Sequence, residues 1–262
     1  MDGENPFPAE RTAVITGAAS ARGIGRATAD RLARDGWSIA ILDLDEEGAK
    51  RTAAKIAGNR SVAALGVGAD VADEGSVDAA IAQVEAGLPP IIGLANVAGV
   101  SSAIDFLDVT TAEWDRVFDI NMRGVFLVTR RVVPAMLAAG VGRIVSVSSV
   151  SAQRGGGTYS KVPYSASKAA IIGFSRALAR ELGPHGITVN CVAPGPIDTD
   201  IMGGTLSEER KAELGAANMV GRVGTVDEVA ALMAFLLGEE AGHITAATYN
   251  INGGLQVSSC RR

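Results

Sequence analysis

The chain has 262 residues, of which 47% are hydrophobic and 20% charged, and its formal net charge is -5. This negative balance argues against a nucleic-acid partner, whose phosphates require a basic surface. No apolar run approaches the ~18 residues of a membrane span, and no charged-then-apolar leader follows Met1. Cys191 and Cys260 lack metal-ligand spacing and suit a reducing compartment. We therefore expect a cytoplasmic protein with no metal, membrane or nucleic-acid partner.

Short apolar runs alternate along the chain with longer segments of helical composition. The expected strands are 13–15, 37–42, 62–67, 91–95, 143–147, 188–192 and 248–251, and the expected helices include 24–33, 46–56, 111–139 and 164–182. Continuous apolar strands separated by helices indicate a parallel sheet covered on both faces. We therefore predict an α/β fold, a doubly wound parallel sheet (Rossmann fold) of about seven strands, as a single domain. It spans 1–262 and begins with a tail at 1–10.

A glycine-rich turn follows the first expected strand and contains Gly17, Gly23 and Gly25. Sheets of this class bind ligands outside the carboxyl ends of their strands. A glycine turn before a helix lets backbone N–H groups approach a pyrophosphate, which the helix N-terminus also favours. A plain strand-to-helix connection is the alternative interpretation. We predict phosphate binding at this turn.

Asp43 ends the second expected strand, about 20 residues past the glycines, where a carboxylate can bind both hydroxyls of an adenosine ribose. Such a carboxylate would repel a 2′-phosphate, so Asp43 favours NAD. Its alternative is an N-cap for the following helix, a role that Asp45 could equally fill. Arg22 favours NADP, because a guanidinium beside the glycines could reach a 2′-phosphate. We give Asp43 the greater weight because it lies nearer the ribose, and we predict NAD as the cofactor.

Tyr164 and Lys168 are four residues apart, so on a helix they share one face. A cation beside a phenol favours the phenolate and lowers its pKa, which suits acid–base chemistry near neutral pH. An accidental pair on a solvated helix is the alternative. Two histidines, His185 and His243, stand outside any ligand-like cluster.

Several motifs occur in one order and resemble the single-domain short-chain dehydrogenase/reductases over roughly residues 10 to 256. They are Thr16-Gly17, Gly23-Ile24-Gly25, Asn96-Val97-Ala98-Gly99, Asn121, Ser149, Tyr164 with Lys168, and Pro194-Gly195 with Thr199. Three departures stand out. The glycine turn and the loop between Ser149 and Tyr164 are both longer than usual, and Val97 replaces the usual second Asn of the central motif.

The resemblance implies a catalytic set of Asn121, Ser149, Tyr164 and Lys168. Tyr164 would act as general acid in ketone reduction and general base in alcohol oxidation. Lys168 would lower the pKa of Tyr164 and bind the nicotinamide ribose. Ser149 would hold the substrate oxygen, with Ser151 as the fallback, and Asn121 would bind a water that links Lys168 to solvent.

The resemblance also implies the cofactor contacts, with Asp70 at the adenine amino group and the segment after Pro194 at the nicotinamide amide. A turn or N-cap is the local alternative for Asp70. The full predicted set is Gly17, Ser20, Arg22, Gly23, Ile24, Asp43, Leu44, Asp70, Val71, Asn96, Ala98, Gly99, Tyr164, Lys168, Pro194, Gly195, Ile197 and Thr199. Relatives commonly form tetramers through their long helices, so we expect a homotetramer.

Candidate substrate contacts are Ser151, Arg154, Tyr159 and Met202, and 200–223 fits a substrate lid with glycine hinges. A surface helical excursion is the alternative for that segment. We predict an oxidoreductase that transfers a hydride between NAD(H) and a small secondary alcohol or ketone of polyol, sugar or hydroxy-acid type. One alternative is a 3-oxoacyl ketoreductase using NADP(H), although Gly140 and His185 stand where acyl-carrier ketoreductases tend to place arginines. The others are an NAD-retaining sugar epimerase or dehydratase and a non-catalytic dinucleotide sensor.

Overall fold

Seven parallel strands form one sheet in the order β3-β2-β1-β4-β5-β6-β7. The computed structural model describes residues 7–202 and 204–257. The strands are β1 (Thr12–Thr16), β2 (Ser38–Asp43), β3 (Ala64–Gly68), β4 (Ile91–Asn96), β5 (Gly142–Val147), β6 (Ile187–Pro194) and β7 (Thr248–Ile251). Strands β2 and β3 are added on one side of β1, and β4 to β7 are added on the other side. Such a change in the order of the strands leaves a crevice for a ligand at their carboxyl ends, here between β1 and β4.

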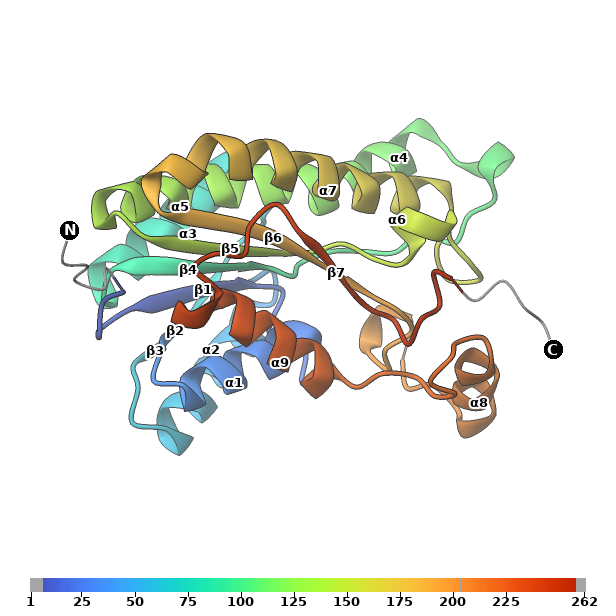
Figure 1. Ribbon diagram of the computed structural model, residues 1–262, viewed down its shortest axis with the longest axis horizontal. Coiled ribbons are helices and arrows are strands. Elements are labelled where there is room, and N and C mark those ends of the chain that lie inside the picture. Colours follow the sequence, from blue (N-terminus) through green and yellow to red (C-terminus); the bar gives the residue numbers. More distant parts are fainter. Residues whose placement is uncertain (1–6, 203, 258–262) are drawn as a thin grey trace.

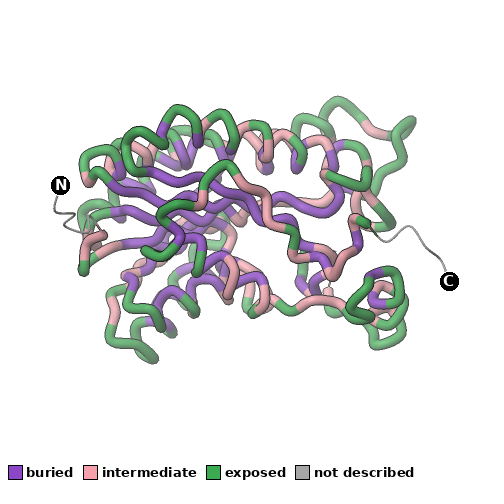
Figure 2. The backbone as a smooth tube through the Cα atoms, in the orientation of Figure 1, coloured by how far each residue is buried: buried purple, intermediate pink, exposed green. Residues whose placement is uncertain are grey.

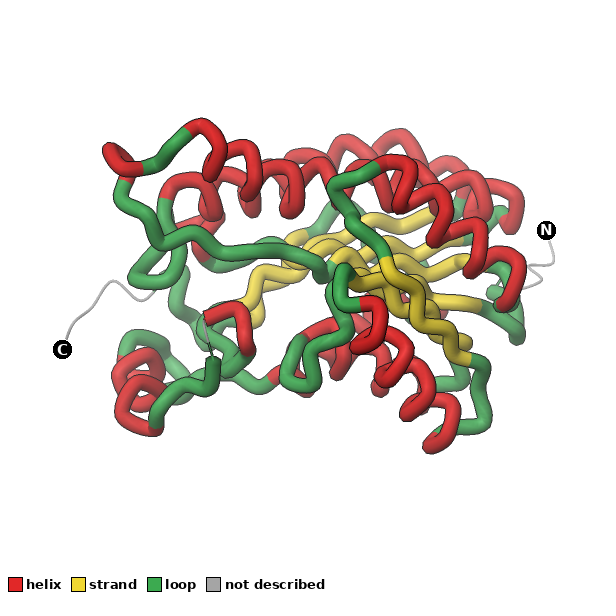
Figure 3. Tube along the Cα trace, turned by 180° about the vertical axis from the view of Figure 1, so that it is seen from behind, coloured by secondary structure: helices red, strands yellow, loops and turns green. Residues whose placement is uncertain are grey.

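Helices cover both faces of the sheet (Figures 1 and 3). They are α1 (Ile24–Arg34), α2 (Glu46–Asn59), α3 (Glu74–Gly87), α4 (Thr111–Phe118), α5 (Gly124–Ala139), α6 (Ser151–Arg154), α7 (Val162–Leu182), α8 (Glu208–Ala216) and α9 (Val226–Leu237). In Figure 1, α1, α2 and α9 lie on one side of the sheet, and α3, α5 and α7 lie on the other. The α8 helix stands apart from both layers, beyond the ends of the strands.

Two buried clusters, one on each face, hold these layers together (Figure 2). Alternate residues of a strand point to opposite faces. Accordingly Ala13 and Ile15 of β1 pack with α1, α2 and α9, whereas Val14 between them packs with α3, α5 and α7. Burial of strands on both faces explains why they read as continuous apolar runs. The predicted fold class is confirmed.

The predicted helix over 111–139 is interrupted by a π-helix at Asp119–Arg123. In this turn the Gly124 amide bonds the carbonyl of Asp119, five residues back rather than four. Asp45 is the N-cap of α2 through a bond to the Gly48 amide, so the capping role considered for Asp43 belongs to Asp45.

The predicted tail at 1–10 lies mostly outside the described residues, which begin at Phe7. The Phe7 ring packs edge-on against Trp37 with centroids 5.7 Å apart. Across 7–202 and 204–257, no helix combines the length and apolar character needed to cross a membrane. In the same residues, no three or more His, Cys, Asp or Glu side chains gather as a metal site would require, and Cys260 falls outside the described part.

Candidate active site

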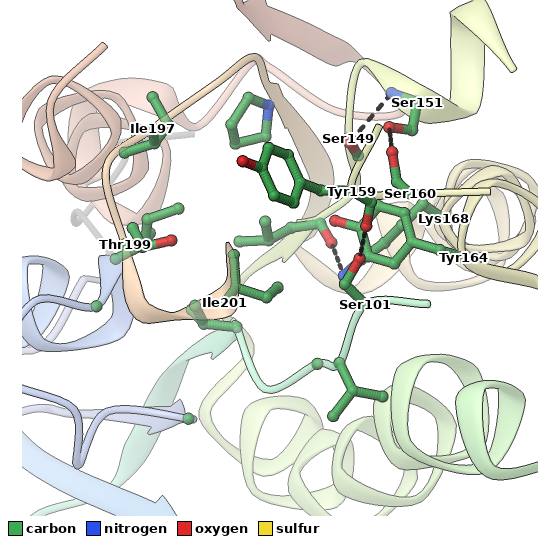
Figure 4. Close-up of a pocket in the computed structure, with 18 of the residues that line it drawn as sticks. Ser101, Ser149, Ser151, Tyr159, Ser160, Tyr164, Lys168, Ile197, Thr199 and Ile201 are labelled. Carbon is green, nitrogen blue, oxygen red and sulfur yellow. Dashed lines mark hydrogen bonds between the residues drawn. The ribbon is translucent and has the colours of Figure 1, made fainter. Parts of the chain in front are cut away.

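A cavity of about 610 Å³ opens at the carboxyl ends of the strands, on the side where the crevice is expected. Its walls come from the turn after β1, the ends of β2, β4, β5 and β6, the start of α7 and the segment around α8. Figure 4 shows Tyr164, Lys168 and Ser149 together on one wall, with Thr199 and Ile197 opposite.

Tyr164 and Lys168 lie in the first turns of α7, a helix of 21 residues that Pro163 helps to start. Lys168 is buried, and its Nζ donates to the carbonyl of Val147 at the end of β5 over 2.8 Å. The same Nζ lies 5.8 Å from the centre of the half-buried Tyr164 ring. Ser148 Oγ donates to the Lys168 carbonyl over 2.8 Å, so the end of β5 holds this part of α7 at two points.

Burial governs the acidity of both groups. It raises the pKa of the Tyr164 phenol above 10, and a hydrogen bond with Ser149 opposes part of that rise. Burial lowers the pKa of the Lys168 ammonium from 10.5 to about 8. The expected depression of the Tyr164 pKa by Lys168 is absent from this arrangement, because burial of the phenol raises that pKa and the Lys168 Nζ is directed at the Val147 carbonyl.

Ser149 and Ser151 have different hydrogen-bond partners in the structure (Figure 4). Ser149 Oγ bonds Tyr164 and accepts from the Ser151 amide over 3.1 Å. Ser151 Oγ instead bonds Ser160 Oγ, 2.8 Å away across the following loop. Ser149 is therefore the hydroxyl placed beside the phenol, whereas Ser151 ties the loop to α6.

The glycines of the turn after β1 lie in close contact with neighbouring backbone. Gly17 has φ +69°, and a Cβ there would lie 2.7 Å from the Ala98 Cα. A Cβ on Gly25 would lie 2.5 Å from the Gly17 carbonyl oxygen, so the turn and the first turn of α1 pack directly together. Gly23 is the N-cap of α1 and offers no side-chain cap, which leaves the helix N-terminus able to bind an anion.

Asp43 lines the cavity, yet its carboxylate already has partners. Oδ2 accepts from the Ala19 amide over 2.9 Å, and Oδ1 accepts from the Asp45 amide over 3.1 Å. Asp43 therefore connects the glycine turn to the start of α2 by hydrogen bonds.

Comparisons with known proteins identify the family. Residues 17–256 match the family model described as enoyl-(acyl carrier protein) reductase. The chain is 41% identical over 247 residues to the short-chain type dehydrogenase/reductase y4mP of Sinorhizobium fredii, covering 94% of this chain and 98% of that protein. The chain is a short-chain dehydrogenase/reductase.

Two further relatives in this family concern the reaction. The 3-oxoacyl-[acyl-carrier-protein] reductase FabG of Aquifex aeolicus is 38% identical, over 94% of this chain and 97% of its own length. The crystal structure of an actinorhodin polyketide ketoreductase variant with NADPH superposes with a TM-score of 0.87 at 34% identity, covering 95% of this chain and 98% of that one. The dehydrogenase/reductase is thus an oxidoreductase acting on carbonyl or CH–OH groups.

The prediction of NAD is wrong. The actinorhodin ketoreductase structure, which superposes on this chain, contains NADPH, whereas the prediction rested on the position of Asp43. Both oxygens of Asp43 accept backbone hydrogen bonds, so its carboxylate also joins the glycine turn to the start of α2.

Arg22 leaves the cavity and crosses to the segment after β6. It donates to Asp198 over 2.5 Å, lies 3.4 Å from Asp200 and also bonds Thr205. Its neighbour Ser20 lines the cavity and donates to Asp200 over 2.6 Å. The predicted lid at 200–223 is therefore fastened to the glycine turn.

Two other predicted residues lie behind the cavity rather than in its wall. The buried Asn96 donates from Nδ2 to Thr129 and Ser146, each over 3.2 Å. The buried Asn121, in the π-turn, bonds both the amide and the carbonyl of Val100, and also Ser167. Its amide group holds the loop after β4 against α7, and the expected water contact of Asn121 stays a prediction.

The remaining predicted positions do line the cavity: Gly17, Ser20, Gly23, Ile24, Leu44, Asp70, Val71, Ala98, Gly99, Pro194, Gly195, Ile197, Thr199, Arg154 and Tyr159. Asp70 also closes its own turn by accepting from the Ala72 amide, the alternative considered for it. The side chain of Met202 lies outside the described part of the chain.

Sequence reasoning missed three side chains on the substrate side. Ser101 donates to the backbone carbonyl of Tyr159, and Ser160 holds Ser151 (Figure 4). Arg210 of α8 donates to Tyr159 Oη over 3.2 Å and lies 5.2 Å from its ring centre. Arg210 and Tyr159 are 51 residues apart in the sequence, so no helix or strand periodicity could have predicted their contact.

Proposed function

We propose that this protein is an NADP(H)-dependent ketoreductase that reduces the keto group of a 3-oxoacyl-type substrate. The observation that carries the proposal is one cavity that joins Ser149, Tyr164 and Lys168 to the anion-binding glycine turn. FabG of Aquifex aeolicus and the NADPH-bound polyketide ketoreductase support the substrate class and the cofactor.

The described residues fit a dinucleotide. Gly17 and Gly25 leave no room for side chains at the turn, and the α1 N-terminus offers free N–H groups. In our proposal Ser20, Gly23 and Ile24 hold the phosphates, Asp70 and Val71 the adenine, and Ala98 and Gly99 its ribose. Pro194, Gly195, Ile197 and Thr199 would hold the nicotinamide, and Arg22, reoriented from its present contacts, would bind the 2′-phosphate.

When bound, NADPH supplies the hydride for the carbonyl carbon. The raised pKa of Tyr164 keeps its phenol protonated, which is the form that a general acid needs to donate a proton to the substrate oxygen. Ser149 donates a hydrogen bond to that oxygen as negative charge develops on it. Lys168 stabilises the tyrosinate left after proton transfer, and Asn121 fixes the loop that carries Gly99.

The substrate would enter between the loop after α6 and the α8 segment, where Arg154 and Tyr159 line the cavity. Gly140 and His185 are both exposed and supply no permanent cation for an acidic carrier protein. We therefore propose a 3-oxoacyl thioester or free β-keto compound as the substrate, without a carrier protein docked at those positions.

NADPH consumption should be followed with acetoacetyl-CoA, free β-keto esters and a panel of simple ketones. Tyr164→Phe should lower kcat by about 10²- to 10⁴-fold, the usual contribution of a general acid. It should still bind NADPH, because the phenol oxygen is not part of the phosphate turn. Turnover of Tyr164→Phe at the wild-type rate would overturn the proposed role, and consumption of NADH alone would overturn the cofactor.

A further inference from the structure

Carboxylates of the chain itself occupy the phosphate-binding donors of the glycine turn. Asp200 takes a hydrogen bond from Ser20 Oγ on its Oδ2 and faces Arg22 Nη1 with its Oδ1 at 3.4 Å. An anion bound between a hydroxyl and a guanidinium is also how a phosphate monoester would sit at these two side chains. Asp200 lines the same cavity as Ser20.

Asp198 extends this contact into the body of the 200–223 segment. Besides the guanidinium of Arg22, its carboxylate holds the Leu206 amide at 3.1 Å and Lys211 Nζ at 3.0 Å. Arg22 also bonds Thr205. One arginine of the glycine turn is thus connected to both ends of the loop that leads into α8.

The same segment reaches the substrate side through Arg210 and Tyr159. The segment is therefore attached at the glycine turn and at the loop after α6, and Figure 4 labels Tyr159 of that loop and Ile201 of the segment. A 2′-phosphate would bring charge of about -2 to a place where two carboxylates already face Arg22, and like charges at such separations repel.

We propose that Asp200 is an internal competitor for the cofactor phosphate: NADP(H) displaces it from Ser20 and Arg22 and so detaches the 200–223 segment from the glycine turn. This rests on the proposed use of NADP(H). It couples cofactor binding to the mobility of a segment that also contacts the substrate loop through Arg210. NADH shares the pyrophosphate that competes for Ser20 but lacks the 2′-phosphate, so it leaves the contacts of Arg22 with Asp198 and Asp200 in place.

Asp200→Asn tests the competition, because it keeps the shape of the side chain and removes its charge. The dissociation constant of NADPH, measured by fluorescence titration, should fall about three- to fivefold, as expected from loss of an exposed ion pair. The dissociation constant of NADH should fall less, because NADH competes with Asp200 only at Ser20. The matched control is Glu209→Gln, the same charge change on α8 at an exposed carboxylate that forms no salt bridge with any described residue. An unchanged or raised NADPH constant in Asp200→Asn, or an equal gain in Glu209→Gln, overturns the proposal.

Hydrogen exchange tests the detachment. NADPH should speed exchange of the backbone amides in 205–217 of the wild-type protein, and NADH should not. In Asp200→Asn these amides should exchange faster before any cofactor is added. Slower exchange with NADPH would overturn detachment.

Both measurements use cofactor binding alone, so they remain informative if no ketone is turned over. Tighter NADPH than NADH binding with no effect of Asp200→Asn would reject the competition while leaving the proposed cofactor intact. Absence of turnover with every β-keto substrate would reject the proposed substrate class and leave the competition standing.

Discussion

At the scale of residues, the chemistry of this site depends on how deeply each group is buried. Lys168 is buried and Tyr164 half-buried, and the loss of contact with water shifts the pKa of each in the direction that favours its neutral form. The phenol stays protonated well above neutral pH, whereas the ammonium begins to lose its proton near pH 8. Lys168, not Tyr164, is therefore the group whose titration limits ketone reduction at alkaline pH.

We expect kcat/KM for ketone reduction to fall as pH rises through about 8, because Lys168 then loses the charge that stabilises the tyrosinate. Lys168→Arg keeps a cation at every pH of the assay. Its activity should be lower, since a guanidinium fits the buried site less well, but its alkaline limb should move to higher pH. A pH–rate profile of both proteins checks this, and identical limbs would contradict it.

Loss of the Lys168 proton lowers activity as pH rises, but it increases the stability of the folded protein. The unfolded chain holds the Lys168 proton up to a pKa near 10.5, whereas the folded chain releases it near 8. Between these values the unfolded state binds more protons, so the free energy of unfolding rises with pH. Lys168→Met should remove that rise, as urea denaturation at pH 8 and above would show.

At the scale of elements, the glycine turn is restricted by contact as well as by its dihedral angles. Gly17 and Gly36 both have positive φ, +69° and +81°. A Cβ on Gly17 would strike the Ala98 backbone at 2.7 Å, whereas a Cβ on Gly36 would have no heavy atom within 4 Å among the described residues. The two positions therefore separate backbone strain from steric overlap.

Gly36→Ala should lower the free energy of unfolding by about 1 kcal/mol, the cost of a left-handed alanine. Gly17→Ala should cost more, on the order of 2–4 kcal/mol, because β1 and β4 must also move apart. It should weaken NADPH binding as well, whereas Gly36→Ala should not. Chemical denaturation and cofactor titration measure both effects, and equal losses at the two sites would contradict the argument.

At the scale of the whole molecule, apolar side chains are left exposed along α4 and α5. Trp114 is 37% exposed, Phe126 42% and Leu137 41%. Trp114 also stacks on Phe118 with ring centres 4.7 Å apart. Because exposed apolar surface of this kind marks interaction sites, we propose that these helices pair copies of the chain, and the predicted homotetramer remains our expectation.

Phe126→Glu should lower the mass of the assembly measured by light scattering, because a carboxylate would be buried at the contact. Ala54→Glu, at an exposed position of α2 on the other face, is the control and should leave the mass unchanged. A wild-type protein with the mass of one chain would contradict the expectation. The cytoplasmic location likewise stays a prediction of the composition.

Local sequence patterns, meaning apolar runs and residues at helical spacing, were enough to predict most of the fold. The apolar runs that became β1 to β7, the glycine turn and the four-residue step from Tyr164 to Lys168 can all be read from the sequence. Each depends on neighbours along the chain, whose relative positions follow from helix and strand geometry. That is why the sheet, the family and the Ser149–Tyr164–Lys168 group were within reach.

Only the tertiary structure decided which partners the charged residues take. Asp43 looks like a ribose ligand by its position, and the fold also makes it an acceptor for the backbone amides of Ala19 and Asp45. Arg22 turns to Asp198 and Asp200, far from it in the chain, and Arg210 meets Tyr159 in the same way. A carboxylate or guanidinium binds whichever oppositely polar group the fold brings near. That choice depends on packing between distant segments, which no local pattern encodes.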